Sequence, residues 1–156
     1  MGVKPTQCRC ASEALLGRFH TKGTLPGLQP LVDLCNAALL AFAISLPVFD
    51  LDRVSGDLEL RHATERGIKE SVGGGAEHHD PGEAIFSDEA GHAHARRWAN
   101  RQRGRSAVRD RTNRALIVAQ ALHPTAAEDV ARPAAELRMI VVALPSSAAV
   151  EKRRVA

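Results

Sequence analysis

Aromatic side chains are scarce in this chain. It contains no Tyr, four Phe and one Trp, and aromatic residues make up 3% of the sequence. Proteins that bind single-stranded nucleic acid by stacking its bases present aromatic side chains on one surface. The composition argues against such a stacking platform, and any contact with nucleic acid is expected to fall on phosphate or ribose.

Cysteines are also few, and no apolar segment is long. Cys8, Cys10 and Cys35 cannot all pair within one chain, and no second Cys or His cluster completes a zinc-type spacing, which predicts free thiols in a reducing compartment. The first ten residues lack an apolar signal core, and the longest apolar run, residues 37–48, is too short to cross a bilayer. We therefore expect a cytoplasmic protein with no membrane contact and no cofactor.

Positive charge is concentrated in one segment. The chain carries a formal net charge of +3, but the segment from Arg96 to Arg114 holds eight arginines against one acid, Asp110. Such a block attracts phosphate. The arginines expected to face nucleic acid are Arg96, Arg101, Arg103, Arg105 and Arg109. The alternative is a solvated surface in which these side chains pair with acids elsewhere in the chain.

The first half of the chain reads as helix, turn and strand. Residues 12–19 predict a short helix with Ser12 as its N-cap, and residues 30–43 predict a buried helix that starts at Pro30. A turn is expected over residues 52–56. Residues 57–63 alternate polar and apolar side chains, which predicts a half-buried strand.

The second half predicts a hairpin followed by helices. Residues 65–82 contain three consecutive glycines and Pro81, so we expect a loop or hairpin tip there. The remaining residues predict, in chain order, a strand over residues 84–87, a tight turn over 88–91, a returning strand over 92–98, a helix over 111–122, a shorter helical stretch interrupted by Pro133, and an apolar segment over 139–144.

These elements predict one α+β domain, with a mixed or antiparallel sheet covered by the helices over residues 30–43 and 111–122. A length of 156 residues can bury a core of that size. We expect the domain to span residues 24–144, with an N-terminal segment over 1–23 and a basic tail over 145–156.

Four ordered blocks carry a resemblance to a known family. They are LPGLQPLVDLCNAALL, PVFDLDRVSGDLELRHAT, PGEAIFSDEAG and RRWANRQRGRSAVRDRTNRALIVAQAL. In this order they resemble freestanding proteins similar to the B3/4 domain of the phenylalanyl-tRNA synthetase beta subunit, over roughly residues 24–140. That resemblance implies a B3/4-type α+β fold. In the synthetase the domain is the editing module, which hydrolyses the ester of tRNA mischarged with tyrosine.

The resemblance can be carried onto individual residues. Asp33 and Asn36 match the family's Val-Asp-x-x-Asn helix, and residues 49–52 match its Phe-Asp-Leu-Asp turn. Pro47 stands where the synthetase domain has a His two positions before the Phe of that turn. The resemblance therefore implies a pocket that contains Asn36 but a different amino-acid preference.

The implied function is hydrolysis of mischarged aminoacyl-tRNA by a domain that is not a complete synthetase. An aminoacyl ester is already labile, so a site needs to position water, hold the terminal ribose and stabilise an oxyanion. Asn36 is expected to orient the substrate ammonium group or the water. The expected catalytic residues are Asn36, Arg97, Asn100 and Gln102, and the expected partner is the aminoacylated 3′ end of tRNA.

Two other functions remain open. In the first, the chain is a non-catalytic tRNA-binding or RNA-binding module with a vestigial pocket, a reading that Pro47 favours and Asn36 opposes. In the second, it binds a small molecule, either an amino acid or a nucleotide, which a closed pocket with no basic rim would favour. His92 and His94 have a spacing that can hold a metal ion on one strand face, but no third ligand is placed beside them, so we expect no metal.

Overall fold

The computed structural model describes residues 11–64, 81–96, 101–102 and 104–143, with the backbone alone described at residue 101 and residues 139–143. Predictions for Arg97, Trp98, Asn100 and Arg103, and most of the 65–82 loop, lie outside these residues. The elements in chain order are α1 (Ala11–Lys22), α2 (Pro30–Phe42), β1 (Val48–Asp50), the 3₁₀ helix η1 (Leu51–Arg53), β2 (Leu58–His62), β3 (Ala84–Asp88), β4 (Ala93–Arg96), β5 (Arg101–Gln102), β6 (Ala115–Ile117) and α3 (Ala126–Ala143).

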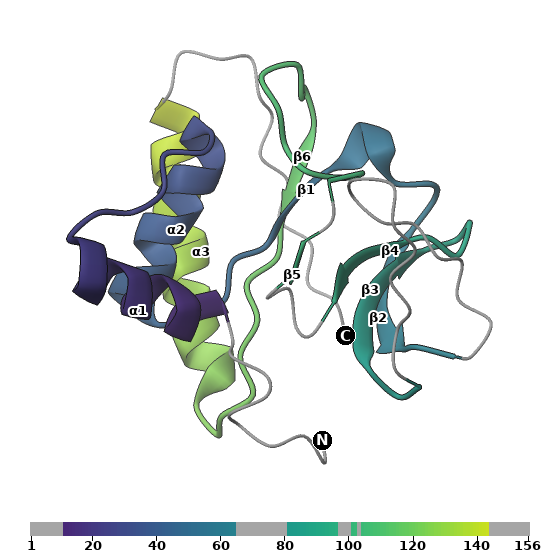
Figure 1. Cartoon of the computed structure of the whole chain (residues 1–156), viewed down its shortest axis with the longest axis horizontal. Helices are drawn as coiled ribbons and strands as arrows, with labels where there is room; N and C mark the ends of the chain where they lie inside the picture. Colours follow the sequence, from purple (N-terminus) through teal and green to yellow (C-terminus); the bar gives the residue numbers. More distant parts are fainter. Residues whose placement is uncertain (1–10, 65–80, 97–100, 103, 144–156) are drawn as a thin grey trace.

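The described elements form helices and two antiparallel sheets, which confirms the α+β prediction. Strands β1 and β6 pair with each other, and the other sheet has the order β2-β3-β4-β5. Figure 1 shows the three helices together on one side, the four-stranded sheet on the other, and the β1–β6 pair between them. None of the described helices combines the length and apolarity that a membrane span needs.

Helix α2 begins and ends for local reasons, of which the sequence indicates Pro30. The Gln29 side chain caps it by accepting hydrogen bonds from the backbone N–H groups of Leu31 (2.9 Å) and Val32 (3.2 Å). Pro30 occupies the first turn, where its missing N–H costs nothing. The helix ends before Ala43, whose φ of 54° is left-handed. The prediction of a buried helix over residues 30–43 is confirmed.

The predicted hairpin is also confirmed. Strand β3 pairs with β2 on one side and with β4 on the other, and the turn between β3 and β4 closes at Gly91, which has a φ of 80°. A register shift between Phe86 and Ser87 marks an irregularity in the β3–β4 pair. The structure thus places the expected strands over residues 57–63 and 84–87 next to each other.

The predicted helix over residues 111–122 is wrong. Residues Ala115–Ile117 form β6, which pairs with β1 so that Leu116 lies opposite Phe49. The apolar run Leu-Ile-Val fits both a helix and a strand, because a short run cannot separate the two periods. Pairing decides the outcome, since β1 is buried and its backbone groups need partners.

Helix α3 differs from its prediction as well. It continues through Pro133 and the apolar segment after it, whereas the sequence suggested an interrupted helix. A proline inside a helix removes one backbone hydrogen bond and costs about 3 kcal/mol. Val130 and Leu137, two turns apart, both pack into the core formed with α2, and this burial offsets the cost.

The core has two main parts that meet at β1. One part joins the helices to β1 and is built on Cys35, Leu39, Val48 and Leu137. The other joins Phe49 to Phe86 and Ala95 of the four-stranded sheet. Phe49 is fully buried, and its ring centroid lies 5.2 Å from that of Phe86. Phe49 therefore connects the β1–β6 pair to the larger sheet.

We expect Phe49→Ala to lower the free energy of unfolding by about 3–5 kcal/mol, because it opens a cavity where the two sheets meet. Urea unfolding measures this change. Phe19→Ala is the matched control, because Phe19 is 48% exposed on α1 and should change stability by less than about 0.5 kcal/mol. Equal effects of the two substitutions would contradict the role given to Phe49.

Burial also makes Cys35 unreactive. It raises the pKa of the Cys35 thiol to about 12, and the thiolate is the form that reacts. In a Cys8→Ser, Cys10→Ser background, we expect Cys35 to resist Ellman's reagent in the folded protein and to react fully in denaturing urea. Rapid labelling under native conditions would show that this part of the core is open.

Candidate functional site

The residues 104–114 that follow β5 form a loop held against the end of β1 by Asp50. This residue is 6% exposed, and its N–H donates to the carbonyl of Ser106 at 2.9 Å. Its carboxylate accepts hydrogen bonds from the Thr112 hydroxyl at 2.7 Å and from the N–H of Asp52 at 3.0 Å. One buried carboxylate thus joins the loop to the first turn of η1.

Further hydrogen bonds close the loop on itself. The Arg109 N–H donates to the Thr112 hydroxyl at 3.0 Å, and the Thr112 N–H donates back to the Arg109 carbonyl at 2.9 Å. The Arg109 guanidinium donates to the carbonyl of Gly104 at 3.1 Å. Beyond the turn, the Leu51 N–H donates to the Arg114 carbonyl at 2.9 Å. The backbone that carries these arginines is therefore fixed by the fold.

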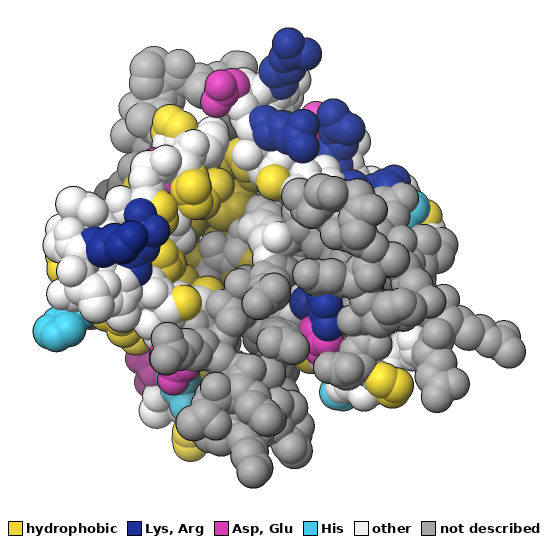
Figure 2. Space-filling model, in the orientation of Figure 1, with side chains coloured by type: hydrophobic (Ala, Val, Ile, Leu, Met, Phe, Trp, Pro, Cys, Tyr) yellow, Lys and Arg dark blue, Asp and Glu magenta, His cyan; other side chains and the backbone are white. Residues whose placement is uncertain are grey.

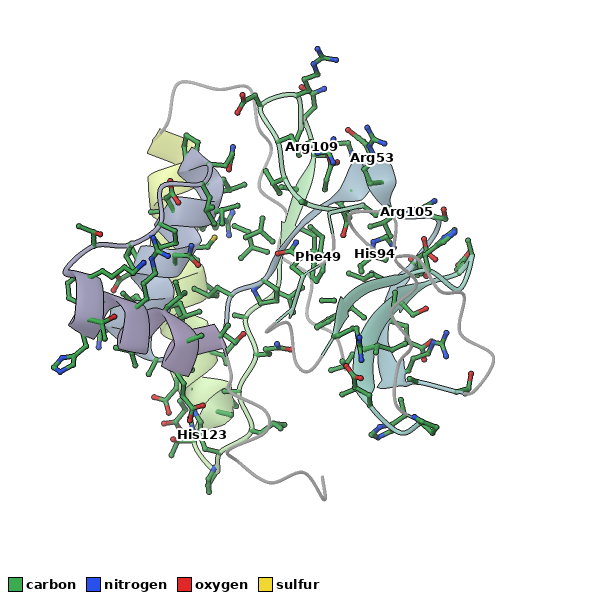
Figure 3. All side chains as sticks on the ribbon, viewed as in Figure 1. Phe49, Arg53, His94, Arg105, Arg109 and His123 are labelled. Carbon is green, nitrogen blue, oxygen red and sulfur yellow. The ribbon has the colours of Figure 1, made fainter. Side chains whose placement is uncertain are left out.

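This arrangement gathers exposed arginines from two distant segments, which we call the arginine surface. It consists of Arg53, Arg105, Arg109, Arg111 and Arg114. Figure 2 shows Lys and Arg side chains gathered over η1 and the neighbouring loop, and Figure 3 shows Arg53 between Arg109 and Arg105. Arg53 lies outside the arginine block and was not predicted, because nothing in the sequence indicates that η1 packs beside that block.

Acidic side chains offset only part of this charge. Within η1 and the 104–114 loop, which carry the arginine surface, the exposed acids are Asp52 and Asp110. Arg114 lies 3.7 Å from the Asp52 carboxylate, with side chains that are 70% and 44% exposed. Exposed pairs of this kind contribute little to stability and are screened by salt. The surface thus keeps an excess of positive charge that an anion can reach.

Arg96 is placed differently from what the sequence suggested. It is 7% exposed, and its guanidinium donates to both carboxylate oxygens of Glu83, at 2.9 Å and 2.6 Å. A bidentate ion pair of this type is strong, and removing one partner would leave the other charge buried without a partner. The prediction that Arg96 faces nucleic acid is therefore corrected: the side chain is buried and paired with Glu83.

Arg105 and Arg109 are exposed as expected, and the other predicted residues divide into two groups. The side chain of Arg101 and all of Arg97, Asn100 and Arg103 lie outside the described part of the chain. Asn36 lies half-buried on α2, one residue after the buried Cys35, and its carboxamide bonds to none of the described residues. Gln102 of β5 donates a hydrogen bond from its amide to the carbonyl of Val48.

Strand β1 is the element that relates Asn36 to Gln102. The Val48 side chain packs in the same core cluster as Cys35, while its carbonyl binds Gln102. Helix α2, which carries Asn36, thus packs on β1 through Cys35, and Gln102 reaches β1 from the four-stranded sheet. Pro47, which stands where the synthetase domain has a His, is buried, and its carbonyl accepts from the N–H of Val118 at 3.0 Å.

A second buried carboxylate, Asp88, holds the loop that follows η1. It accepts hydrogen bonds from the backbone N–H groups of Ser55 (3.1 Å) and His92 (2.8 Å). The next residue, Glu89, donates its N–H to the Ser55 carbonyl, and its side chain fills the space beside Gly56, which has a φ of 70°. This second anchor fixes the position of η1 and so of Arg53.

His92 and His94 both lie against Asp88. Their ring nitrogens are 3.4 Å and 3.1 Å from its carboxylate oxygens, and the His94 side chain is fully buried. Across the described residues, no group of three or more His, Cys, Asp or Glu side chains is arranged to hold a metal ion. The strand spacing of the two histidines is thus accounted for by contacts with one carboxylate.

The surroundings of Asp88 set its protonation. Burial alone would raise the pKa of Asp88, but the hydrogen bonds from His94, His92 and Ser55 and the electrostatic attraction of His94 lower it below the ordinary value of 3.8. The folded state therefore holds the proton less tightly than the unfolded state does. The stability that Asp88 contributes is complete above the ordinary pKa and is lost as the pH falls below it.

We expect the wild-type protein to lose more stability than Asp88→Asn as the pH falls from about 5 to about 3, since the variant lacks this titration. Urea unfolding across that range measures the difference. Asp52→Asn, at a carboxylate that is 44% exposed, should behave like the wild type. Parallel pH profiles for wild type and Asp88→Asn would contradict the assignment.

Comparison with known proteins identifies the family. The chain matches the B3/4 domain family over residues 1–138. A comparison with curated proteins found no match. The family match covers most of the chain, including α2, the β1–η1 corner, the hairpin and the loop that carries the arginines. On this match and the α+β architecture that accompanies it, the chain belongs to the B3/4 domain family.

Proposed function

We propose that the chain hydrolyses the ester bond of mischarged aminoacyl-tRNA, acting as a relative of the synthetase editing module. The observation that carries this proposal is the B3/4 family match together with Asn36, whose half-buried carboxamide on α2 bonds to none of the described residues. A second support is the arginine surface, which lies at the end of β1, the strand that packs against α2.

Hydrolysis of the ester does not require a strong general base among the side chains. The ester is reactive by itself, so most of the rate increase comes from holding the substrate and a water molecule in place and from stabilising the oxyanion. A carboxamide has both a donor and an acceptor, so Asn36 can accept from the substrate ammonium or the attacking water and donate to a carbonyl. Arg97 and Asn100 are the proposed oxyanion donors.

Gln102 is held against β1 by one hydrogen bond. One of the two N–H groups of its amide donates to the Val48 carbonyl, which leaves the amide oxygen as an acceptor and the second N–H as a donor. The oxygen can accept from the terminal ribose or from water, and the second N–H can donate to an oxyanion. Gln102 can therefore orient the substrate or help to stabilise the oxyanion.

A non-catalytic tRNA-binding module is the second candidate. The observation that favours it is Pro47, which is buried and contributes its carbonyl to the β1–β6 pairing where the synthetase domain has a His. A proline side chain offers no hydrogen bond to a substrate. Under this proposal the chain holds tRNA through the arginine surface without cleaving the ester.

Deacylation assays with correctly and incorrectly charged tRNAs test the first candidate. We expect selective hydrolysis of a mischarged species, slowed on the order of 100-fold by Asn36→Ala, which removes an orienting amide. Asn36→Asp keeps the volume and tests the need for the amide donor. Asn113→Ala, at an exposed position outside α2, is the control and should keep the wild-type rate.

The outcomes separate the two candidates. Hydrolysis that is equal in wild type and Asn36→Ala would remove Asn36 from the site. Absence of hydrolysis, combined with tRNA binding that weakens steeply with salt, would establish the binding module, since phosphate contacts release counterions.

A further inference from the structure

We propose that the arginine surface binds the phosphates of a base-paired RNA stem, with Arg53 as one of its contact residues. This inference rests on the proposed function, in which the substrate is tRNA, and it adds the structural element of the RNA that is held. It also assigns a role to Arg53, which lies more than forty positions before the arginine block in the sequence.

The first support is that the charges are available. Within the described residues, Arg53 and Arg111 form no ion pair, and Arg109 uses its guanidinium only for the carbonyl of Gly104. Arg114 is in an exposed pair with Asp52 at 3.7 Å. A phosphate can replace such an exposed carboxylate at small cost, because the pair is already solvated.

The second support is that the backbone beneath these side chains is fixed. Asp50 joins the 104–114 loop to η1, and Asp88 holds the chain at Ser55 on the other side of η1. Binding then orders side chains alone, which costs less entropy than ordering a loop. A guanidinium presents paired N–H donors that match the oxygens of a phosphate.

The third support concerns the form of the nucleic acid. Proteins that hold single strands pair a basic groove with aromatic side chains that stack on the bases. Phe49 and Phe86 are buried against each other, and Phe19 and Phe42 lie on α1 and α2 in the helical layer. No described aromatic side chain therefore lies among the arginines to serve as a stacking platform.

Double-stranded RNA does not need that platform. Its bases are paired and stacked inside the helix, and proteins recognise it through phosphates and 2′-hydroxyl groups. A rigid set of arginines with no described aromatic side chain among them suits this target. In the tRNA substrate, a base-paired stem next to the 3′ end would be held while the single-stranded end reaches the site near Asn36.

Fluorescence anisotropy with the full chain and a labelled RNA hairpin tests the inference. The salt dependence is measured between about 50 and 200 mM, the range over which phosphate contacts dominate. We expect Arg53→Gln to weaken binding and to reduce the slope of log affinity against log salt by about 1, the change for one phosphate contact. Arg18→Gln removes the same charge from exposed α1, and should leave the slope unchanged.

Four outcomes would overturn the inference. They are no salt-dependent binding of the hairpin, equal slopes for Arg53→Gln and wild type, binding of a single-stranded RNA of the same composition as tight as that of the hairpin, and equal binding of a B-form DNA duplex of the same sequence. The last result would indicate a general polyanion surface.

The deacylation assay separates this inference from the proposed function. Selective hydrolysis with an unchanged slope for Arg53→Gln would leave the editing proposal standing and remove the stem contact. A reduced slope for Arg53→Gln without any hydrolysis would support the stem contact in a binding module.

Discussion

The buried carboxylate of Asp50 is the contact on which the candidate site depends. It accepts from the Thr112 hydroxyl and from the Asp52 N–H, while its own N–H binds Ser106. Hydrogen bonds to a charged group contribute about 1.5–3 kcal/mol, and leaving such a group buried without partners costs more. Two segments more than fifty residues apart therefore stay together, and both carry exposed arginines.

Each of the three residues of β1 contacts a different part of the fold. Val48 packs against the helical layer, Phe49 against the four-stranded sheet, and Asp50 binds the loop that carries the arginines. All three are buried. The family's Phe-Asp-Leu-Asp turn begins at Phe49. The motif therefore forms a turn and also supplies the contacts of Phe49 with the four-stranded sheet and of Asp50 with the 104–114 loop.

Membership of the B3/4 family establishes the kind of domain, whereas the activity has to be argued from the residues of the site. Asn36 favours catalysis, because it matches the polar residue of the family's helix motif. Pro47 argues against catalysis, because it stands where the synthetase domain has a His. The arginine surface belongs to both proposed functions. In these proposals, binding of RNA and cleavage of an ester depend on different residues and can be tested separately.

Local signals determined a large part of the fold. Pro30 indicated the start of α2, the alternating pattern over residues 57–63 indicated β2, and Gly91 closed the predicted hairpin. Cap, turn and alternation signals each act within a few residues, which is why the sequence alone carries them. The resemblance of four ordered blocks supplied the family, and the family match confirms it.

Tertiary packing decided the rest. The run at Leu116 and Ile117 became a strand because β1 needed a partner, and α3 continued through Pro133 because Val130 and Leu137 pack into the core. The exposure of the arginines was decided in the same way. Arg96 is buried against Glu83 and Arg53 is exposed beside Arg109, since contacts between distant segments determine which charges reach solvent.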